Sequence, residues 1–450
     1  MKTIHTVLIL ALVGGLFTRA YQFRERFVYA HDNDLASWIA KDIVVDKHLR
    51  LVGQLTSSPG IFIGPLFYYT LIPFYLSTHM DPLGIVVFSW IIGLCAIASI
   101  YFVFSKLYGS LPAKIASLVY ALSFSISQTE REVVPTTPVM LWTIWFLYAI
   151  HRLFAGQKNS LIILAVLGAL IWHINLALGL LAPLALLGIF HSRKVLRPRD
   201  FLLPVLIFAF LSLPLIYFEA SHQFQQTRSL ISTLSSLPIS SSVSFADKFI
   251  HTLSYIAKNV NLIFLNVTPT GYRLYLLPAL LFIWLIVKFP RTRLLYSLWI
   301  GFYLIFFTLQ PLNLSEYYLH GLNIVWIISF VLLLTFLFRA HPVSRILATV
   351  LMSIFVIYHV HTFLVSGVNP IGYIQKKQLI EYIRQDAQSH GYPCIAVSYM
   401  TDVGYNFGYS YFFWRDYFNV GRHVFEHQNR KIHHVFCLNF YFSKSREKFL

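Results

Sequence analysis

The sequence predicts an all-α polytopic membrane protein of about eleven transmembrane helices, with a small α/β domain at its C-terminal end. Of its 450 residues 57% are hydrophobic and only 12% are charged, and the mean hydropathy is +0.64. These values lie outside the range of soluble globular proteins. Apolar stretches long enough to cross a bilayer recur as far as about Leu364. Continuous apolar runs are typical of membrane helices, whereas a membrane β-barrel alternates apolar and polar residues.

The predicted spans follow one another with short polar breaks. The stretch from residue 161 to residue 189 is too long for one span, and its polar residues 173–175 divide it into two. The first span is predicted to be a retained anchor, because Arg19 lies inside the poor cleavage site that follows it. The spans are His5–Phe23, Leu83–Phe104, Leu111–Ser127, Thr137–Phe154, Leu161–His173, Asn175–Phe190, Phe201–Phe218, Leu274–Val287, Leu294–Leu309, Leu319–Phe338 and Ile346–Leu364.

Basic residues predict the orientation of the chain. If the N-terminus is cytoplasmic, every second loop is basic and faces inward, and among the 18 acidic residues only Asp200 faces the cytoplasm. We therefore expect a multi-pass protein of the plasma (inner) membrane, with an external site and an external C-terminal domain at residues 365–450. The net charge of +17 reflects this orienting bias toward anionic membrane lipid and excludes nucleic acid as the expected partner.

Two long outer loops, residues 24–82 and 219–273, interrupt the predicted transmembrane domain of residues 1–364. The first loop opens with His31, Asp32, Asn33 and Asp34, in a chain with very few carboxylates in its apolar regions. An amphipathic interface helix is predicted at residues 35–49, and a Gly-Pro turn then leads into an aromatic run at the outer interface. Acidic side chains at a membrane surface indicate chemistry, although aspartate at this place is also a preferred N-cap of the predicted helix.

The C-terminal segment has the pattern of a small α/β domain. An amphipathic helix is predicted at Gln375–Gln388 and a strand at Cys394–Val397, and shorter apolar runs follow near Val424 and at residues 434–442. Cys394 and Cys437 both lie in this segment and are available to pair with each other. Its aromatic residues suit either sugar stacking or a small hydrophobic core, and the core is favoured.

Four short segments carry a resemblance to a known family. They are HDNDLASWIAKDI from residue 31, GPLFYYTLIPFY from residue 64, PLIYFEASHQF from residue 214 and SEYYLHGL from residue 315. With the order of spans and loops, they make the chain resemble the GT-C glycosyltransferases, in particular the bacterial branch near protein O-mannosyltransferases and lipid A aminoarabinose transferases. The resemblance covers the membrane part, and the C-terminal segment departs from the best-known members.

The resemblance implies an inverting enzyme that takes a sugar from a polyprenyl-phosphate donor and transfers it to a hydroxyl of a glycan, lipid or protein acceptor. The acceptor hydroxyl must lose a proton, and a carboxylate is the natural base. The family's catalytic acid maps onto Asp32, with Asp34 close behind. Family members often have Glu or Gln after the aspartate, where this chain has Asn33, so either aspartate remains a candidate. A bound Mg²⁺ or Mn²⁺ on Asp32 and Asp34 is an alternative, although the two resembling branches look metal-independent.

A leaving polyprenyl phosphate requires cations or hydrogen-bond donors near the outer face. An alternative role for Arg131 is an ion pair with the flanking Glu130 or Glu132, and tyrosines at this depth also belong to the ordinary aromatic belt. The serine-rich residues 229–244 form either a lid over the site or a plain linker. Candidates for binding donor phosphate or substrate are Arg131, His173, Glu219, His222, Arg228, Glu316, Tyr317 and His320.

Two other classes of protein compete with the enzyme. A transporter or flippase of lipid-linked sugars would place charges at the bilayer midplane and show repeated broken helices. Here the charges gather at the outer edge and no inverted repeat is evident. A polysaccharide polymerase or ligase would depend on His and Arg in an outer loop rather than on an acidic pair in the first loop. The acidic tetrad therefore favours the glycosyltransferase.

Overall fold

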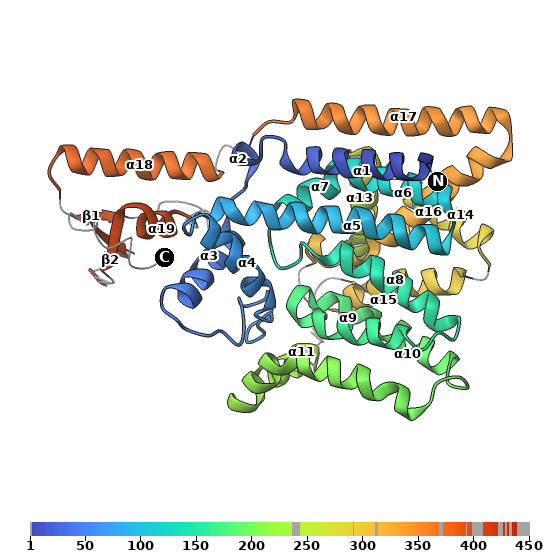
Figure 1. The fold of residues 1–450 in the computed structure, drawn as a ribbon, viewed down its shortest axis with the longest axis horizontal. Coiled ribbons are helices and arrows are strands. Elements are labelled where there is room, and N and C mark those ends of the chain that lie inside the picture. Colours follow the sequence, from blue (N-terminus) through green and yellow to red (C-terminus); the bar gives the residue numbers. More distant parts are fainter. Residues whose placement is uncertain are drawn as a thin grey trace. The chain divides into compact units, whose positions relative to one another are not determined.

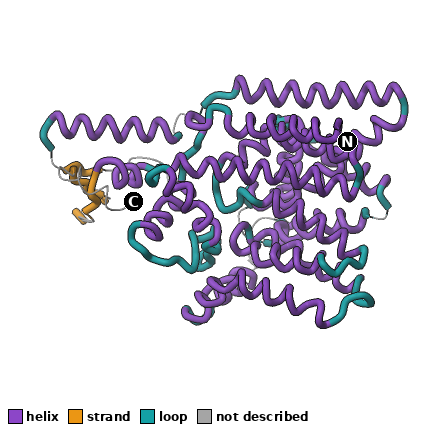
Figure 2. The backbone as a smooth tube through the Cα atoms, in the orientation of Figure 1, coloured by secondary structure: helices purple, strands orange, loops and turns teal. Residues whose placement is uncertain are grey.

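In a computed structural model of the chain, helices make up most of the described residues (Figure 2). These are residues 2–235, 244–290, 292–310, 314–368, 372–392, 394–397, 408–421, 426–427, 430–431 and 434–438. They form two compact units. Unit 1 comprises Met1–Tyr21, Arg50–Phe67 and Ser89–Ser366, and unit 2 comprises Gln22–Leu49, Tyr68–Phe88 and Gly367–Leu450. The division between Ser366 and Gly367 lies close to the predicted boundary at residue 364, and the C-terminal segment shares its unit with parts of the first outer loop.

Unit 1 is a bundle of helices, and each of the eleven predicted spans is mainly helical within the described residues. Short 3-10 helices, η2 (Leu176–Leu181), η3 (Pro198–Phe201) and η4 (Glu316–Leu322), precede three of its helices. The helices, of which α5 starts in unit 2, are α1 (Lys2–Ala20), α5 (Val86–Leu107), α6 (Ser110–Leu122), α7 (Phe124–Arg131), α8 (Val139–Phe154), α9 (Ser160–Ile174), α10 (Ala182–His191), α11 (Leu202–Ser221), α12 (Gln225–Ser235), α13 (Phe245–Leu265), α14 (Arg273–Lys288), α15 (Arg293–Leu309), α16 (Asn323–Ala340) and α17 (Pro342–Val365).

Four helical segments of the described chain are long and apolar enough to cross a membrane, namely Pro82–Leu107, Pro198–Ser221, Glu316–Ala340 and Pro342–Val365. The pair α6 and α7, bent by 57° at its break, makes a fifth if it is one span. Shorter apolar helices of 10–17 residues include those at Thr6–Ala20, Val139–Phe154 and Arg293–Leu309. The chain is thus a helical polytopic membrane protein, as predicted, and the count of eleven spans stays a prediction.

The helices of unit 1 differ sharply in how much of their surface is covered. Of the residues in the most apolar 18-residue stretch of Glu316–Ala340, which ends with α16, 72% are buried. In the segments that contain α11 and α17, the buried fraction of the same kind of stretch is 22% and 17%. The two uncovered helices lie at opposite edges of unit 1, and α16 lies inside it (Figure 1). Apolar side chains such as Phe210 and Ile357 point outward from them. Lipid is the medium in which such surfaces are stable.

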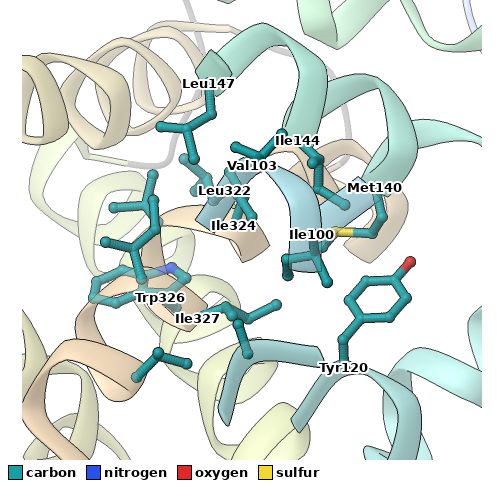
Figure 3. Close-up of a cluster of buried hydrophobic side chains, with 14 of the residues drawn as sticks. Ile100, Val103, Tyr120, Met140, Ile144, Leu147, Leu322, Ile324, Trp326 and Ile327 are labelled. Carbon is teal, nitrogen blue, oxygen red and sulfur yellow. The ribbon is translucent and has the colours of Figure 1, made fainter. Parts of the chain in front are cut away.

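The core of unit 1 is built where α5, α6, α8 and α16 meet (Figure 3). Its side chains are mostly branched aliphatic residues, with a few aromatic ones. Tyr120 carries its hydroxyl group at one edge of the cluster. The side chains at the centre are Ile100, Val103, Tyr120, Met140, Ile144, Leu147, Leu322, Ile324, Trp326 and Ile327.

Two predictions concern the middle of the chain. The predicted break after His173 is confirmed: α9 ends at Ile174, and the Asn175 side chain accepts a hydrogen bond of 3.0 Å from the Ala177 N–H, which caps η2. The predicted outer loop at residues 219–273 contains two helices, α12 and α13, and its place outside the membrane stays a prediction. Helix α13 buries one face in the core, with apolar residues recurring every three or four positions. Of the serine-rich segment, residues 229–235 belong to α12 and residues 236–243 lie outside the described part.

Unit 2 combines helices with a small antiparallel sheet. From the first outer loop it takes α2 (Phe23–Arg26), α3 (His31–Val44), most of α4 (Leu66–Ser77) and η1 (Pro82–Ile85). From the C-terminal segment it takes α18 (Tyr373–Ser389), β1 (Cys394–Val397), α19 (Tyr409–Phe412), the π-helical turn η5 (Phe413–Tyr417), β2 (Phe418–Gly421), β3 (Glu426–His427), β4 (Arg430–Lys431) and β5 (His434–Leu438).

The strands of the C-terminal segment form a three-stranded sheet in the order β1-β5-β2 and a separate two-stranded sheet of β3 and β4. The predicted helix at residues 375–388 and the predicted strand at 394–397 are confirmed. The predicted run near Val424 lies outside the described residues. The register places Cys394 opposite Cys437, and the pairing of the two thiols stays a prediction.

Candidate functional site

The acidic tetrad forms the first turn of α3, which begins at His31 rather than near Leu35. Ala30 is the N-cap residue, and its N–H donates a hydrogen bond of 3.3 Å to Oδ1 of Asn33. The alternative that Asp32 and Asp34 are merely N-caps of the predicted helix is therefore wrong. Both carboxylates lie within the helix, at the end where the helix dipole favours negative charge.

Asp32 and Asp34 occupy opposite environments. Two positions along a helix correspond to a rotation of about 200°, so the two side chains leave α3 on different faces. The Asp32 side chain is 40% exposed, and its Oδ1 lies 3.1 Å from Nδ1 of His31, a contact that raises the pKa of His31. Asp34 is only 5% exposed. Asp32 can therefore meet a substrate, whereas Asp34 faces the interior of unit 2.

Asp34 belongs to a buried polar cluster that the sequence did not predict. Its Oδ1 lies 3.5 Å from the hydroxyl of Tyr29, and the Gly408 N–H donates to its carboxylate. The ammonium group of Lys376, itself 4% exposed, donates a hydrogen bond of 2.6 Å to the Tyr29 carbonyl and attracts the Asp34 charge. Burial raises the pKa of Asp34 to about 6 and lowers the pKa of Lys376 to about 8. The cluster joins α3 to the C-terminal segment.

Gly408 has no room for a side chain. Its φ of 90° lies in the left-handed region, and a Cβ atom would lie 3.0 Å from both Nζ of Lys376 and Cδ1 of Tyr29. A glycine therefore lets the backbone approach the Asp34 carboxylate closely enough to donate its N–H.

We expect the ionisation of Asp34 to lower the stability of the protein. Because the pKa of this carboxyl group is about 6 in the fold and about 4 in an unfolded chain, the folded state binds more protons between these values. The free energy of unfolding should therefore fall as the pH rises from 4 to 6, by up to about 3 kcal/mol from this group. Asp34→Asn should remove this fall, as measured by urea unfolding in detergent micelles across that range.

The matched control for this measurement is Asp46→Asn, which changes a carboxylate that is 42% exposed and paired with Lys41 at 2.6 Å. This variant should keep the pH dependence of the parent protein. An unchanged slope in Asp34→Asn would contradict the assignment of the buried proton to Asp34.

The residues of the tetrad do not fit a metal ion shared by Asp32 and Asp34. The two side chains leave α3 in different directions, and the Lys376 ammonium is close enough to Asp34 to attract its charge, which disfavours a cation there. Among the residues that the structure describes, no three His, Cys, Asp or Glu side chains gather closely enough to hold a metal. We derive no step through a metal.

A second aspartate anchors the C-terminal segment within unit 2. Asp81 accepts hydrogen bonds from the Tyr373 hydroxyl at 2.8 Å and from Lys377 at 3.0 Å, and Nη1 of Arg415 lies 3.1 Å from its Oδ2. It also accepts a bond of 2.9 Å from the Leu83 N–H and so caps η1. These contacts tie the C-terminal segment to the unit that contains the acidic tetrad.

Unit 1 contains a small pocket with a cavity volume of about 50 Å³, lined by polar and apolar residues. It lies between α7, the start of α8, α13 and η4. The candidates Glu316 and His320 line it, together with Asn259 and Asn323, which no sequence pattern had singled out. The lining residues are Ser125, Ile126, Thr129, Glu130, Thr136, Thr137, Val139, Met140, Asn259, Leu262, Glu316, His320 and Asn323.

Both carboxylates of this pocket are paired with basic side chains. Glu130 forms a buried ion pair with Arg19, whose Nη2 and Nε lie 2.5 and 2.6 Å from Oε2, and Oε1 of Glu130 accepts a hydrogen bond from Tyr120. Glu316 pairs with Lys258, and both of these side chains are partly exposed. The partners come from α1 and α13, far from the carboxylates in sequence.

Arg131 is a buried residue of unit 1, and its alternative ion pair with Glu132 stays a prediction. It is 6% exposed and donates a hydrogen bond of 2.8 Å to the Tyr21 carbonyl, and its guanidinium group lies over the ring of Phe363 at 5.9 Å. The predicted ion pair with Glu130 is wrong, because Glu130 binds Arg19 instead. A buried guanidinium group directed at a carbonyl stabilises the chain locally.

The remaining candidates mainly contact backbone groups and side chains of their own unit. His173 accepts from the Leu66 N–H at 3.4 Å and contacts the Leu211 carbonyl at 3.3 Å, so both ring nitrogens are engaged by backbone. Glu219 accepts hydrogen bonds from the N–H groups of Gln226 and Thr227 at the start of α12.

Three further candidates lie in different environments. His222 stacks on Phe218, and the Tyr317 hydroxyl lies 2.9 Å from the Ser57 hydroxyl. Arg228 is exposed on α12. Of the eight candidates, only Glu316 and His320 line the pocket.

The substitution Gly64→Ala should destabilise unit 1. A Cβ atom at Gly64 would lie 2.1 Å from Nδ1 of His173, a ring that cannot yield without breaking its two backbone contacts. Overpacking of this kind costs about 1–3 kcal/mol, which thermal unfolding in detergent would detect. Gly301→Ala is the control, because nothing lies within 4 Å of a Cβ there. Equal stability of the two variants would contradict the close approach at Gly64.

Neither protein-family profiles nor curated protein sequences match the chain significantly. Solved structures do. A crystal structure of ArnT from Cupriavidus metallidurans bound to undecaprenyl phosphate has a TM-score of 0.56 and 12% identity, and the match covers 87% of this chain and 73% of that chain. The apo form of the same protein gives 0.54 and 11%, with the same coverage. At this identity the likeness is one of fold, and the resemblance to lipid A aminoarabinose transferases is confirmed at that level: the chain folds as ArnT does.

Proposed function

We propose that the protein is a membrane glycosyltransferase that moves a sugar from a polyprenyl-phosphate donor to an acceptor hydroxyl at the outer face, with inversion. The observation that carries the proposal is the exposed carboxylate of Asp32 in the first turn of α3. The likeness of fold supports it, since the ArnT structure that covers most of this chain holds undecaprenyl phosphate.

Asp32 is the better base of the two aspartates. A general base must come within about 3 Å of the proton that it removes, and the 40% exposed Asp32 is accessible to an acceptor where the 5% exposed Asp34 is not. In the proposed reaction the acceptor oxygen forms a bond to the anomeric carbon as its proton passes to Asp32. The bond from that carbon to the phosphate oxygen breaks, and the polyprenyl phosphate leaves with the electron pair.

For the leaving phosphate, Arg228 remains the candidate among the predicted cations. Its side chain is exposed on α12, whereas Arg131 and His173 are buried and engaged with backbone groups. An accessible guanidinium group can form paired hydrogen bonds with phosphate oxygens and stabilise the charge that develops on them. Arg228 belongs to the predicted outer loop at residues 219–273, so this segment is proposed to bind the leaving phosphate although much of it is helical.

Transfer by the purified protein in liposomes tests the function. Undecaprenyl-phosphate sugar labelled in the sugar is supplied with an extract of envelope glycans, lipids and proteins, and label in each acceptor class and release of undecaprenyl phosphate are measured. We expect stoichiometric transfer and release, unchanged by EDTA. Two other outcomes would overturn the proposal. Movement of intact donor across the bilayer without cleavage indicates a flippase, and growth of a lipid-linked chain by whole repeat units indicates a polymerase.

A further inference from the structure

The pocket of unit 1 is polar and yet has no unpaired charge of its own. Two carboxylates line it, and each forms an ion pair with one basic side chain. The pair of Arg19 and Glu130 is fully buried, with side-chain exposures of 0% and 3%. The pair of Lys258 and Glu316 lies closer to solvent, at 40% and 46%. The four charges therefore cancel in two local pairs.

Neutral hydrogen-bonding groups supply the rest of the polar lining. Nδ2 of Asn259 donates to Oδ1 of Asn323 at 2.9 Å, and within the described residues the other amide atom of each side chain has no partner. Asn323 is only 6% exposed. The imidazole ring of His320 and the hydroxyl of Thr136 line the same space with no hydrogen bond to a described residue. These polar groups can form hydrogen bonds with a ligand or water that enters the pocket.

This arrangement selects among ligands by charge. Amide, hydroxyl and imidazole groups donate to and accept from sugar hydroxyls, and none of them requires a charged partner. An amino sugar needs an uncommitted carboxylate, and a phosphate or a uronic acid needs an uncommitted cation. Because a buried charge without a partner is strongly unfavourable, a neutral pocket rejects both kinds of charged ligand.

We infer that this pocket is the subsite for an uncharged, hydroxyl-rich sugar, and that the chain discriminates against amino sugars and acidic sugars there. The inference rests on the proposed function, since it names the class of sugar that the donor would carry. The two ion pairs determine which sugar charge the pocket accepts. Removing one partner of the more exposed pair, Lys258 and Glu316, should therefore change the preferred sugar.

A binding measurement tests the inference separately from transfer. The probes are undecaprenyl-phosphate esters of glucose, glucosamine and glucuronic acid, which place a neutral, basic or acidic group on one sugar ring. Purified protein in lipid nanodiscs is titrated with each, and the rise in melting temperature gives the affinity. We expect the glucose ester to bind about tenfold more tightly than either charged one. Equal or tighter binding of a charged ester would overturn the inference.

Charge variants make the test specific to the pocket. Lys258→Met frees the Glu316 carboxylate and should shift the preference about tenfold toward the glucosamine ester. Glu316→Gln frees Lys258 and should shift it toward glucuronic acid. Lys248→Met, on the same helix but not lining the pocket, is the control and should keep the preference of the parent. Unchanged preferences in both folded pocket variants would overturn the inference.

Failure of the inference and failure of the proposed function can be told apart. Selective binding of the neutral ester without transfer of any sugar would support the pocket and overturn the transferase. Transfer that is indifferent to the charge of the sugar would support the transferase and overturn the pocket assignment.

Discussion

Asp32→Asn should reduce sugar transfer by a factor of about 10² to 10⁴, the usual contribution of a general base. The amide has almost the same shape as the carboxylate but cannot accept the proton of the attacking hydroxyl. Since the side chain is 40% exposed at the helix surface, the substitution should leave the fold intact. Initial rates of label transfer in liposomes, at equal amounts of folded protein, measure the effect.

The control for this prediction is Asp46→Asn, which changes an exposed carboxylate of the same outer loop and should transfer at the parental rate. Asp34→Asn provides a second comparison, because that carboxylate is buried inside unit 2 and contributes to its packing. A folded Asp32→Asn variant that keeps more than a tenth of the parental rate would mean that the base lies elsewhere in the chain.

The second large effect concerns stability. Glu130→Leu leaves the guanidinium group of Arg19 buried without a counter-charge, and we expect a loss of about 3–5 kcal/mol in the free energy of unfolding. Removing both charges in Arg19→Met/Glu130→Leu should recover most of that loss, since buried ion pairs are often no more stabilising than apolar residues of similar volume. Denaturant unfolding in mixed micelles gives the coupling energy.

A partly exposed pair provides the comparison. Lys158 and Asp200 lie 2.7 Å apart with side-chain exposures of 35% and 18%, and Lys158→Met should cost no more than about 1 kcal/mol. If Glu130→Leu is no more destabilising than Lys158→Met, the Arg19 charge is compensated by other groups.

The sequence predicts the helices of unit 1 well where they are uniformly apolar. A run such as Asn323–Ala340 contains one charged residue and is recognised by composition alone. Helix α13 escapes this rule, because Asp247, Lys248, Lys258 and five further polar residues make Phe245–Leu265 look like part of a loop. Its buried stripe at every third or fourth position was the signal that a periodicity search would have found.

The candidate site is predictable only in its local part. Asp32 and Asp34 attract attention because carboxylates are rare in the apolar regions of the chain, and their helix begins close to the expected residue. No local sequence pattern identifies the residues with which the charged groups pair. Arg19 meets Glu130 across 111 residues, Tyr373 meets Asp81 across 292, and Lys376 meets the Tyr29 carbonyl across 347. Contacts of that range follow from tertiary packing, which a single sequence does not display.

The ion pair of Arg19 and Glu130 also sets an order of events during synthesis. The ribosome adds about 5–20 residues per second, so Glu130 is made roughly 6–20 s after Arg19. During this interval the nascent α1 carries an uncompensated cation beside its apolar residues, and the long arginine side chain can keep that charge in the aqueous interface. The first helix can take its final place only once α7 has emerged, so its packing waits for the 111 residues that separate Arg19 from Glu130.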